Sequence, residues 1–172
     1  MSIAIRLAVI MLAVCLLGCA DNKSTSTISD SDAIYYLVRH AEKTLEKPDP
    51  ELTVQGKKRA IDLSKRLADI PLSKIYSSDF TRTRDTAIPT AYLKNLDITI
   101  YDPKSLEDFA ATLLNDTGHI LVVGHSNTTP PLSKLLGGDA GEPIIEATEY
   151  NRFYIVTRSG QKVSSVIETY GD

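Results

Sequence analysis

Short apolar segments recur along this chain, and polar stretches or segments with helical spacing separate them. Two of these segments, 33–39 and 119–125, are almost continuously apolar, which is typical of strands buried on both faces of a parallel sheet. Shorter strands are predicted at 73–77 and 96–101. The pattern therefore predicts four strands with helices between them.

Amphipathic helices are predicted between these strands. After Thr53, apolar residues recur at spacings of three and four while lysine and arginine occupy the other faces. A helix should therefore begin there, with Thr53 as its N-cap, and end at Pro71. Three further helices are predicted, at 80–93, 105–116 and 126–138. Pro89 should break or kink the first of them, Ser105 should cap the second, and the prolines of the third fall in its first turn, where they are tolerated.

Two more strands are predicted near the end of the chain. The segments 152–158 and 162–170 flank Ser159-Gly160-Gln161, which predicts a hairpin. Four alternations of strand and helix followed by a hairpin predict an α/β fold, a three-layer α/β/α sandwich with a mostly parallel sheet and one antiparallel edge. A chain of 172 residues that is 42% hydrophobic and 24% charged suits a single globular domain, which we assign to residues 33–172.

The N-terminal segment differs from this domain. Leu7–Leu17 is an uninterrupted apolar run after one positive charge; it is too short to span a bilayer, which needs about 20 residues, but suits a secretory signal. The run ends in Leu16-Leu17-Gly18-Cys19, which resembles the bacterial lipobox, where cleavage precedes a cysteine that is then acylated. This resemblance implies a signal peptide at residues 1–18 and a lipidated Cys19. An ordinary signal peptide with an incidental cysteine and an uncleaved anchor are the alternatives.

The next segment is expected to link the lipid to the domain. Residues 20–32 are rich in Ser, Thr and Asp without apolar periodicity, which predicts a flexible tether, so that residues 19–32 form the lipidated cysteine and its linker. Resemblance to lipoprotein sorting slightly favours the outer membrane, with the domain on the periplasmic side and a lipid anchor as its sole membrane contact. A net charge of −3 offers no bulk attraction for nucleic acid.

Two of the three histidines end predicted strands. His40 follows the strand 33–39 directly, and His125 ends the strand 119–125. Ligands of open parallel sheets gather at the carboxyl ends of strands, so both histidines fall where a site is expected. His119 begins its strand, about 20 Å from His125 at about 3.3 Å per residue, and is expected to be a surface histidine.

Arginines beside these positions favour an anion as the ligand. Arg39 precedes His40, and Arg82 and Arg84 lie in the first turn of the helix predicted at 80–93, where unpaired N–H groups favour negative charge. A guanidinium matches phosphate oxygens with a planar fork of donors. A transition metal needs three or four converging ligands; with two suitable histidines and arginine as a neighbour, neither a metal nor another cofactor is predicted.

Three segments of the sequence resemble the signature segments of a known family. "LVRHAEK", "YSSDFTRTRDTA" and "VVGHSNT" are similar to the signature segments of the histidine phosphatase superfamily, which has the phosphoglycerate mutase-like fold, and the resemblance spans residues 34–130. It implies that His40 is the nucleophile that becomes phosphohistidine and that Arg39, Arg82 and His125 complete the phosphate pocket. Arg84 does not match the family's arginine and should face solvent or pair with an acid.

The resemblance implies a metal-independent phosphatase that hydrolyses phosphate monoesters, such as a phosphorylated small molecule or a phosphosugar. A catalytically weak phosphoanion-binding lipoprotein is the alternative. Asn127 and Lys43 are candidates for substrate binding. The donor of a proton to the leaving oxygen stays open between Asp102, Glu107, Glu42 and Glu149, or is absent.

Overall fold

The computed structural model describes residues 32–46 and 48–171. The predicted signal peptide, the lipidated Cys19 and the tether up to residue 31 lie outside the described residues. Within these two ranges, no helix combines the length and the apolar character that crossing a membrane requires.

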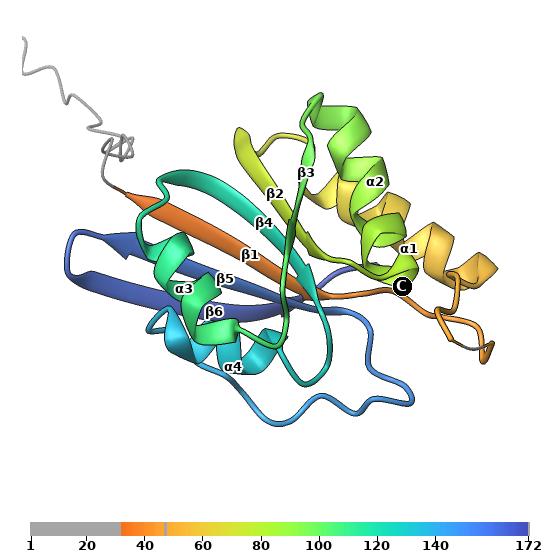
Figure 1. Ribbon diagram of the computed structural model, residues 1–172. Coiled ribbons are helices and arrows are strands. Elements are labelled where there is room, and N and C mark those ends of the chain that lie inside the picture. The colour runs from red at the N-terminus through yellow and green to blue at the C-terminus, as the bar shows by residue number, and fades with distance from the viewer. Residues whose placement is uncertain (1–31, 47, 172) are drawn as a thin grey trace, which may run out of the picture.

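Residues 32–46 and 48–171 form six strands and four helices, which follow one another in the predicted order. The strands are β1 (Ala33–Arg39), β2 (Leu72–Ser78), β3 (Ile98–Tyr101), β4 (Gly118–Gly124), β5 (Arg152–Ser159) and β6 (Lys162–Thr169). The helices are α1 (Val54–Arg66), α2 (Thr81–Lys94), α3 (Leu106–Leu114) and α4 (Thr129–Leu135). The strands form one sheet in the order β3-β2-β4-β1-β5-β6, in which β5 is antiparallel to β1 and to β6 while the other pairs are parallel (Figure 1).

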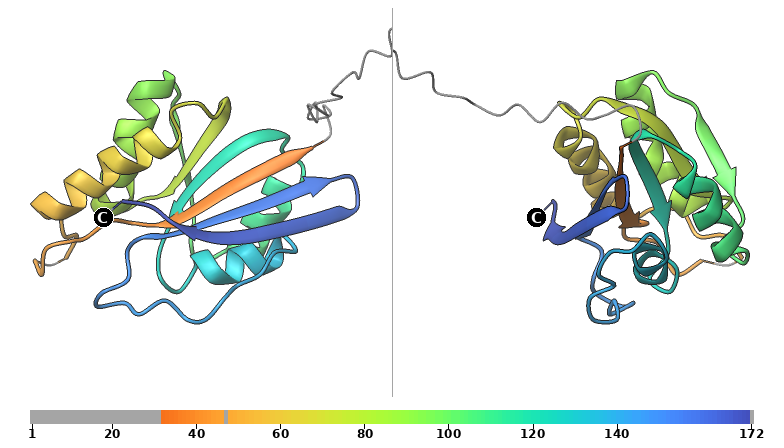
Figure 2. Two further views of the ribbon diagram at one scale, coloured as in Figure 1. Left: turned by 180° about the vertical axis from the view of Figure 1, so that it is seen from behind. Right: turned by 90° about the vertical axis from the view of Figure 1, so that its left-hand side faces the viewer.

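Helices cover both faces of this sheet. Figure 1 and Figure 2 show α1 and α2 on one face and α3 and α4 on the other. Alternate residues of β1 enter opposite cores: Tyr35 and Leu37 pack with α3 and α4, whereas Tyr36 and Val38 pack with α1 and α2. The predicted three-layer α/β/α sandwich is confirmed.

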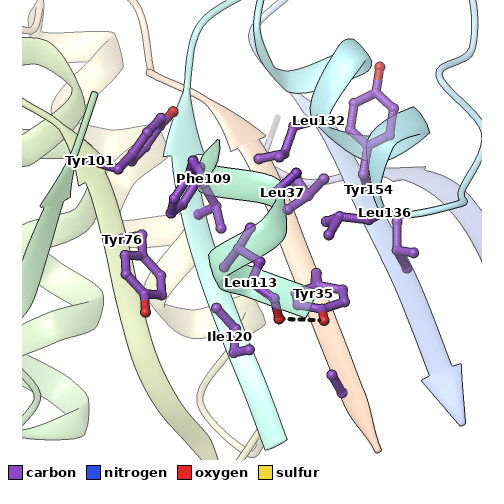
Figure 3. Packing of buried hydrophobic residues seen from close by; sticks show 14 of the residues in the cluster. Tyr35, Leu37, Tyr76, Tyr101, Phe109, Leu113, Ile120, Leu132, Leu136 and Tyr154 are labelled. Atoms are coloured by element: carbon purple, nitrogen blue, oxygen red, sulfur yellow. Dashed lines mark hydrogen bonds between the residues drawn. The ribbon is translucent and has the colours of Figure 1, made fainter. Parts of the chain in front are cut away.

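The core beneath α3 and α4 is rich in aromatic residues (Figure 3). Tyr101 and Phe109 stack with ring centroids 4.0 Å apart. The hydroxyl of Tyr35 donates a hydrogen bond of 2.8 Å to the carbonyl of Leu113 at the end of α3, drawn as a dashed line in Figure 3. This bond satisfies the polar group of a fully buried tyrosine, so burying its ring in the core carries no unpaired hydroxyl.

The helix boundaries test the capping predictions. Thr53 caps α1, since its hydroxyl accepts a hydrogen bond of 3.0 Å from the backbone N–H of Gly56. Ser105 is the N-cap residue of α3, as predicted, but its side chain makes no capping hydrogen bond. Helix α2 runs through Pro89 without interruption, so the predicted break there is wrong; burial of Ala87, Thr90 and Ala91 on both sides of the proline holds the helix together.

Gly56 lies where α1 meets the loop that follows β1. A Cβ atom at this position would lie 2.1 Å from the carbonyl oxygen of Glu42. The same carbonyl accepts a hydrogen bond of 2.9 Å from the backbone N–H of Thr53. The absence of a side chain at Gly56 therefore lets α1 dock against the segment that carries His40.

Candidate active site

The pairing of β1 with β4 sets the distance between the two predicted site histidines. The two strands are parallel neighbours in which Arg39 lies opposite Gly124, and the N–H of His40 donates a hydrogen bond of 2.9 Å to the carbonyl of Gly124. His40 and His125 therefore leave adjacent strands side by side. Their ring centroids are 5.5 Å apart with an interplanar angle of 68°.

Arg39 lies buried beside this pair, with 1% of its surface exposed. Its Nη1 donates a hydrogen bond of 2.9 Å to the carbonyl of Glu149, and its Cζ lies 4.1 Å from the centroid of the Tyr150 ring. Its Nε and Nη2 have no acceptor among the residues that the structure describes. Because a buried donor without an acceptor costs about 1–3 kcal/mol, these two N–H groups point to a ligand that accepts hydrogen bonds.

Arg82 approaches the same pair from the first turn of α2. Its Nη2 lies 3.4 Å from Nδ1 of His125, and its Nη1 lies 3.6 Å from a carboxylate oxygen of Asp49. Its Cζ lies 4.3 Å from the centroid of the Phe80 ring. Within the described part of the chain, its buried Nε finds no acceptor. Two arginines therefore present free donors around the two imidazoles.

The hydrogen bonds fix the tautomers of both histidines. The carbonyl of Ala41 accepts a hydrogen bond of 2.8 Å from Nδ1 of His40, because a carbonyl oxygen cannot donate; Nε2 of neutral His40 is then left with its lone pair. For His125, the guanidinium of Arg82 donates to Nδ1, so Nε2 carries the hydrogen and donates to the hydroxyl of Ser78 at 2.8 Å. His40 thus offers a nucleophilic nitrogen beside a hydrogen-bonded partner imidazole.

Both imidazoles are held neutral at physiological pH. Burial lowers the pKa of His40 to about 3, and the positive charges of Arg39 and Arg82 act in the same direction. Burial also lowers the pKa of His125 to about 4, again with help from the two arginines. A histidine can attack phosphorus only in its neutral form, and this environment keeps His40 in that form over a wide pH range.

The two predicted substrate-binding residues line pockets on either side of Arg82. Asn127 is exposed and lines a pocket of about 220 Å³ with Arg82 and His125. Lys43 lines a second pocket, of about 350 Å³, which also includes Arg82. Each residue therefore shares a pocket with Arg82, and their binding roles stay predictions.

Arg84 has an acidic partner of its own. Its guanidinium pairs with the carboxylate of Asp79. The expectation that Arg84 would pair with an acid, and that Arg82 alone of the two would approach the histidines, agrees with this geometry.

The four candidate proton donors have other partners or lie on the surface. Glu42 accepts three hydrogen bonds of 2.8–3.0 Å from Arg59. Glu149 pairs with Arg152 and accepts a hydrogen bond from the N–H of Ile145. Asp102 accepts a turn hydrogen bond from the N–H of Lys104, and Glu107 is exposed in the first turn of α3. In this structure each of the four therefore has another partner or lies on the surface, and the choice among them stays a prediction.

His119 is buried, so the predicted surface position is wrong, although its predicted separation from His125 is correct. Its side chain stacks on Tyr36 with ring centroids 5.9 Å apart, and its Nδ1 lies 2.9 Å from the Tyr36 hydroxyl. The cause is the neighbouring strand β1, whose Tyr36 covers the imidazole. His119 sits at the beginning of β4, at the opposite end of the strand from His125, and is not part of the site.

Four contacts of the site were not predicted from the sequence. Tyr150 and Phe80 stack on the arginines, Asp49 approaches Arg82, and Glu146 lines the Lys43 pocket. Burial lowers the pKa of Arg82, and the negative charges of Asp49 and Glu146 oppose that shift. Phe80 lies within the segment YSSDFTRTRDTA, whereas Tyr150, Asp49 and Glu146 belong to no recognised motif and reach the site through the fold. Among the described residues, no group of three or more His, Cys, Asp or Glu side chains is arranged to hold a metal ion.

The sheet carries two neutral imidazoles between two arginines at its carboxyl edge, and the unpaired donors of these arginines suit an anion such as phosphate. Residues 35–109 match the family model described as histidine phosphatase superfamily (branch 1). The segment that this model matches includes Arg39, His40 and Arg82, and the chain shares its fold with solved histidine phosphatases. No curated protein sequence matches the chain.

Solved structures of phosphatases share this fold at low sequence identity. Mycobacterial glucosyl-3-phosphoglycerate phosphatase in complex with inorganic phosphate is 13% identical, with a TM-score of 0.59 over 81% of this chain and 97% of that one. Phosphoserine phosphatase from Entamoeba histolytica is 16% identical, with a TM-score of 0.55 over 81% and 97%. The protein histidine phosphatase SixA in complex with tungstate is 16% identical, with a TM-score of 0.58 over 80% and 95%. At these identities the neighbours establish the fold.

Proposed function

We propose that this protein is a phosphatase that hydrolyses phosphate monoesters through a phosphohistidine intermediate on His40, without a metal ion. The observation that carries the proposal is the free Nε2 lone pair of a neutral His40 next to buried arginine donors that lack acceptors within the described residues. Phosphoryl transfer needs mainly positioning and stabilisation of charge on the phosphate oxygens. Arg39 and Arg82 supply that charge stabilisation.

The reaction would proceed in two displacements. The lone pair on Nε2 of His40 attacks phosphorus, a P–N bond forms, and the P–O bond to the leaving group breaks as its oxygen takes up a proton. The positive charge that develops on the ring is stabilised by the hydrogen bond from Nδ1 to the Ala41 carbonyl. Water then attacks phosphorus and loses a proton, the P–N bond breaks, and inorganic phosphate leaves with the imidazole restored.

The choice of leaving group depends on how its oxygen receives a proton. The four acids weighed above have other partners or lie on the surface. When none of these four donates the proton, leaving groups that tolerate negative charge react fastest. We therefore propose phosphorylated small molecules or phosphosugars with good leaving groups as substrates; the phosphate esters named for the structural neighbours support this class.

A phosphoanion-binding lipoprotein with weak turnover is the second candidate. The same observation favours it, because a site that grips phosphate and lacks an aimed acid can bind without rapid hydrolysis. Phosphate binding without measurable turnover would identify this function.

We also propose that Cys19 is lipidated and that residues 33–172 act outside the cytoplasm, on the periplasmic side and with the outer membrane slightly favoured. The lipobox-like segment at Leu16–Cys19 supports this proposal. Labelling with radioactive palmitate should mark the expressed full chain and fail to mark Cys19→Ser. Equal labelling of both would contradict lipidation at this residue.

Turnover of p-nitrophenyl phosphate by the full chain tests the phosphatase proposal. His40→Asn should abolish product release, whereas His119→Asn, a matched change of a buried histidine outside the site, should retain it. A brief reaction with labelled substrate should trap a phosphate that is labile to acid and stable to alkali, and it should be lost in His40→Asn. EDTA should leave the rate unchanged; inhibition reversed by a divalent ion would contradict metal independence.

A further inference from the structure

Each arginine of the site lies against the face of one aromatic ring. The Cζ atom of Arg39 is 4.1 Å from the centroid of Tyr150, and that of Arg82 is 4.3 Å from the centroid of Phe80. The two rings come from unrelated parts of the chain: Phe80 precedes α2, and Tyr150 precedes β5. The same contact is therefore made twice, by two different segments.

The same two rings also contact the histidines. Tyr150 lies 6.1 Å from His40, centroid to centroid, at an angle of 53°. Phe80 lies 5.1 Å from His125 in an edge-to-face arrangement at 90°. Each histidine–arginine pair thus has an aromatic ring of its own.

Stacking leaves the donors of a guanidinium available because they lie in its plane. An aromatic ring covers one face, attracts the positive charge, and restricts rotation of the plane. For Arg39, a hydrogen bond restricts this rotation further. Its Nη1 donates to the carbonyl of Glu149, the residue next to Tyr150. The two remaining donors, Nε and Nη2, have no acceptor in the described ranges of the chain.

Arg82 likewise has an aromatic contact, partnered nitrogens and an unpartnered nitrogen. Phe80 covers one face of its guanidinium, Nη1 and Nη2 approach Asp49 and His125, and the buried Nε has no acceptor in the portion of the chain that the structure describes. In both arginines, the ring sets the plane in which the unpaired donors point.

We infer that Tyr150 and Phe80 are positioning residues of the phosphate pocket, which hold the guanidinium planes of Arg39 and Arg82 so that their free donors converge on one anion. The inference rests on the proposed function, since it assigns a role within the same pocket. It also makes the segment between α4 and β5 part of the site through Tyr150.

Removing a ring should weaken the binding of phosphate without unfolding the protein. A cation–π contact of this kind accounts for about a 2- to 30-fold difference in affinity. Tyr150→Leu and Phe80→Leu should therefore weaken binding of inorganic phosphate by about 2- to 30-fold. Tyr150→Phe should bind within about twofold of the wild type, since it retains the ring.

Calorimetric titration of the full chain with inorganic phosphate tests the inference, together with kcat and KM for p-nitrophenyl phosphate. Tyr92→Leu is the matched control, because Tyr92 is 90% exposed near the end of α2, outside the site. Urea denaturation of each variant identifies general destabilisation, and rescue by Tyr150→Phe separates positioning by the ring from a structural role.

The outcomes separate this inference from the proposed function. Weaker phosphate binding in both leucine variants, with Tyr150→Phe and Tyr92→Leu close to wild type, supports it even where turnover is absent and the phosphatase proposal fails. Wild-type phosphate affinity in Tyr150→Leu and Phe80→Leu would overturn the inference. The phosphatase proposal would still stand in that case, provided that the wild-type protein hydrolyses p-nitrophenyl phosphate. Equal losses in Tyr150→Phe and Tyr150→Leu would also overturn the inference, since the ring would then not be the cause.

Discussion

Lowering the pH from 7.5 to 5.5 should destabilise the folded protein through two buried histidines. His40 and His125 have pKa values of about 3 and about 4 in the folded state because of burial and the nearby arginines. In the unfolded chain both return to about 6.5. Between these values the unfolded state binds protons that the folded state does not, so stability falls as the pH falls.

The size of this effect follows from the linkage relation. At pH 5.5 both folded imidazoles are still neutral, while an unfolded histidine is mostly protonated. Each group then lowers the free energy of unfolding by about 1.4 kcal/mol between pH 7.5 and 5.5, and the two together lower it by about 2.7 kcal/mol. Carboxylates with lowered pKa values, such as Asp62, contribute only below about pH 4.

Urea denaturation at the two pH values, in buffers without phosphate, measures this effect. The double variant His40→Asn/His125→Asn should lose about 2.7 kcal/mol of the pH dependence, and each single variant should lose about half of it. His119, whose pKa burial also lowers, and Asp85, whose pKa burial raises, are common to all these proteins and cancel in the comparison. An equal loss of stability in wild type and double variant between pH 7.5 and 5.5 would refute the reasoning.

Three further outcomes are expected. Gly56→Ala should destabilise the fold by about 1–3 kcal/mol in urea denaturation, although alanine favours a helix by about 1 kcal/mol over glycine, because the new Cβ would press on the Glu42 carbonyl; a stabilised variant would contradict this. Asp49→Asn should tighten phosphate binding in calorimetry by about 1.5- to 5-fold, since the carboxylate competes for the guanidinium of Arg82; weaker binding would show instead that the carboxylate is needed. Arg82→Ala should lower kcat/KM for p-nitrophenyl phosphate by about 10²–10³-fold, whereas Arg84→Ala should stay near wild type, and equal losses would contradict the assignment.

The sequence was sufficient for those parts of the site that depend on local pattern. The strands β1 and β4 are the most continuously apolar segments of the domain, and a residue that follows a parallel strand lies at a defined edge of the sheet. His40 and His125 could therefore be expected at the same edge. The spacing of Arg82 within its motif distinguished it from Arg84.

Contacts between distant segments could not be predicted in the same way. The ring of Tyr150 meets Arg39 only because the chain between α4 and β5 returns to the end of β1, and nothing local to Tyr150 indicates this path. The burial of His119 depends likewise on Tyr36 from another strand. Strand β3 begins at Ile98, two residues later than predicted, because it is a short edge strand with one neighbour, and Leu96 packs instead against the core beneath α1 and α2.

The position of β4 within the sheet has a consequence for the growing polypeptide. This strand lies between β1 and β2, which do not pair with each other. The segments that carry His40 and Arg82 are therefore not held side by side until β4 has been synthesised and has paired with both strands. Pairing strands that are widely separated in sequence costs loop-closure entropy, so these strands are expected to assemble cooperatively. A nascent chain that stops short of residue 124 would contain Arg39, His40 and Arg82 but not the strand that brings them together. We therefore expect phosphatase activity only after β4 has been added to the sheet.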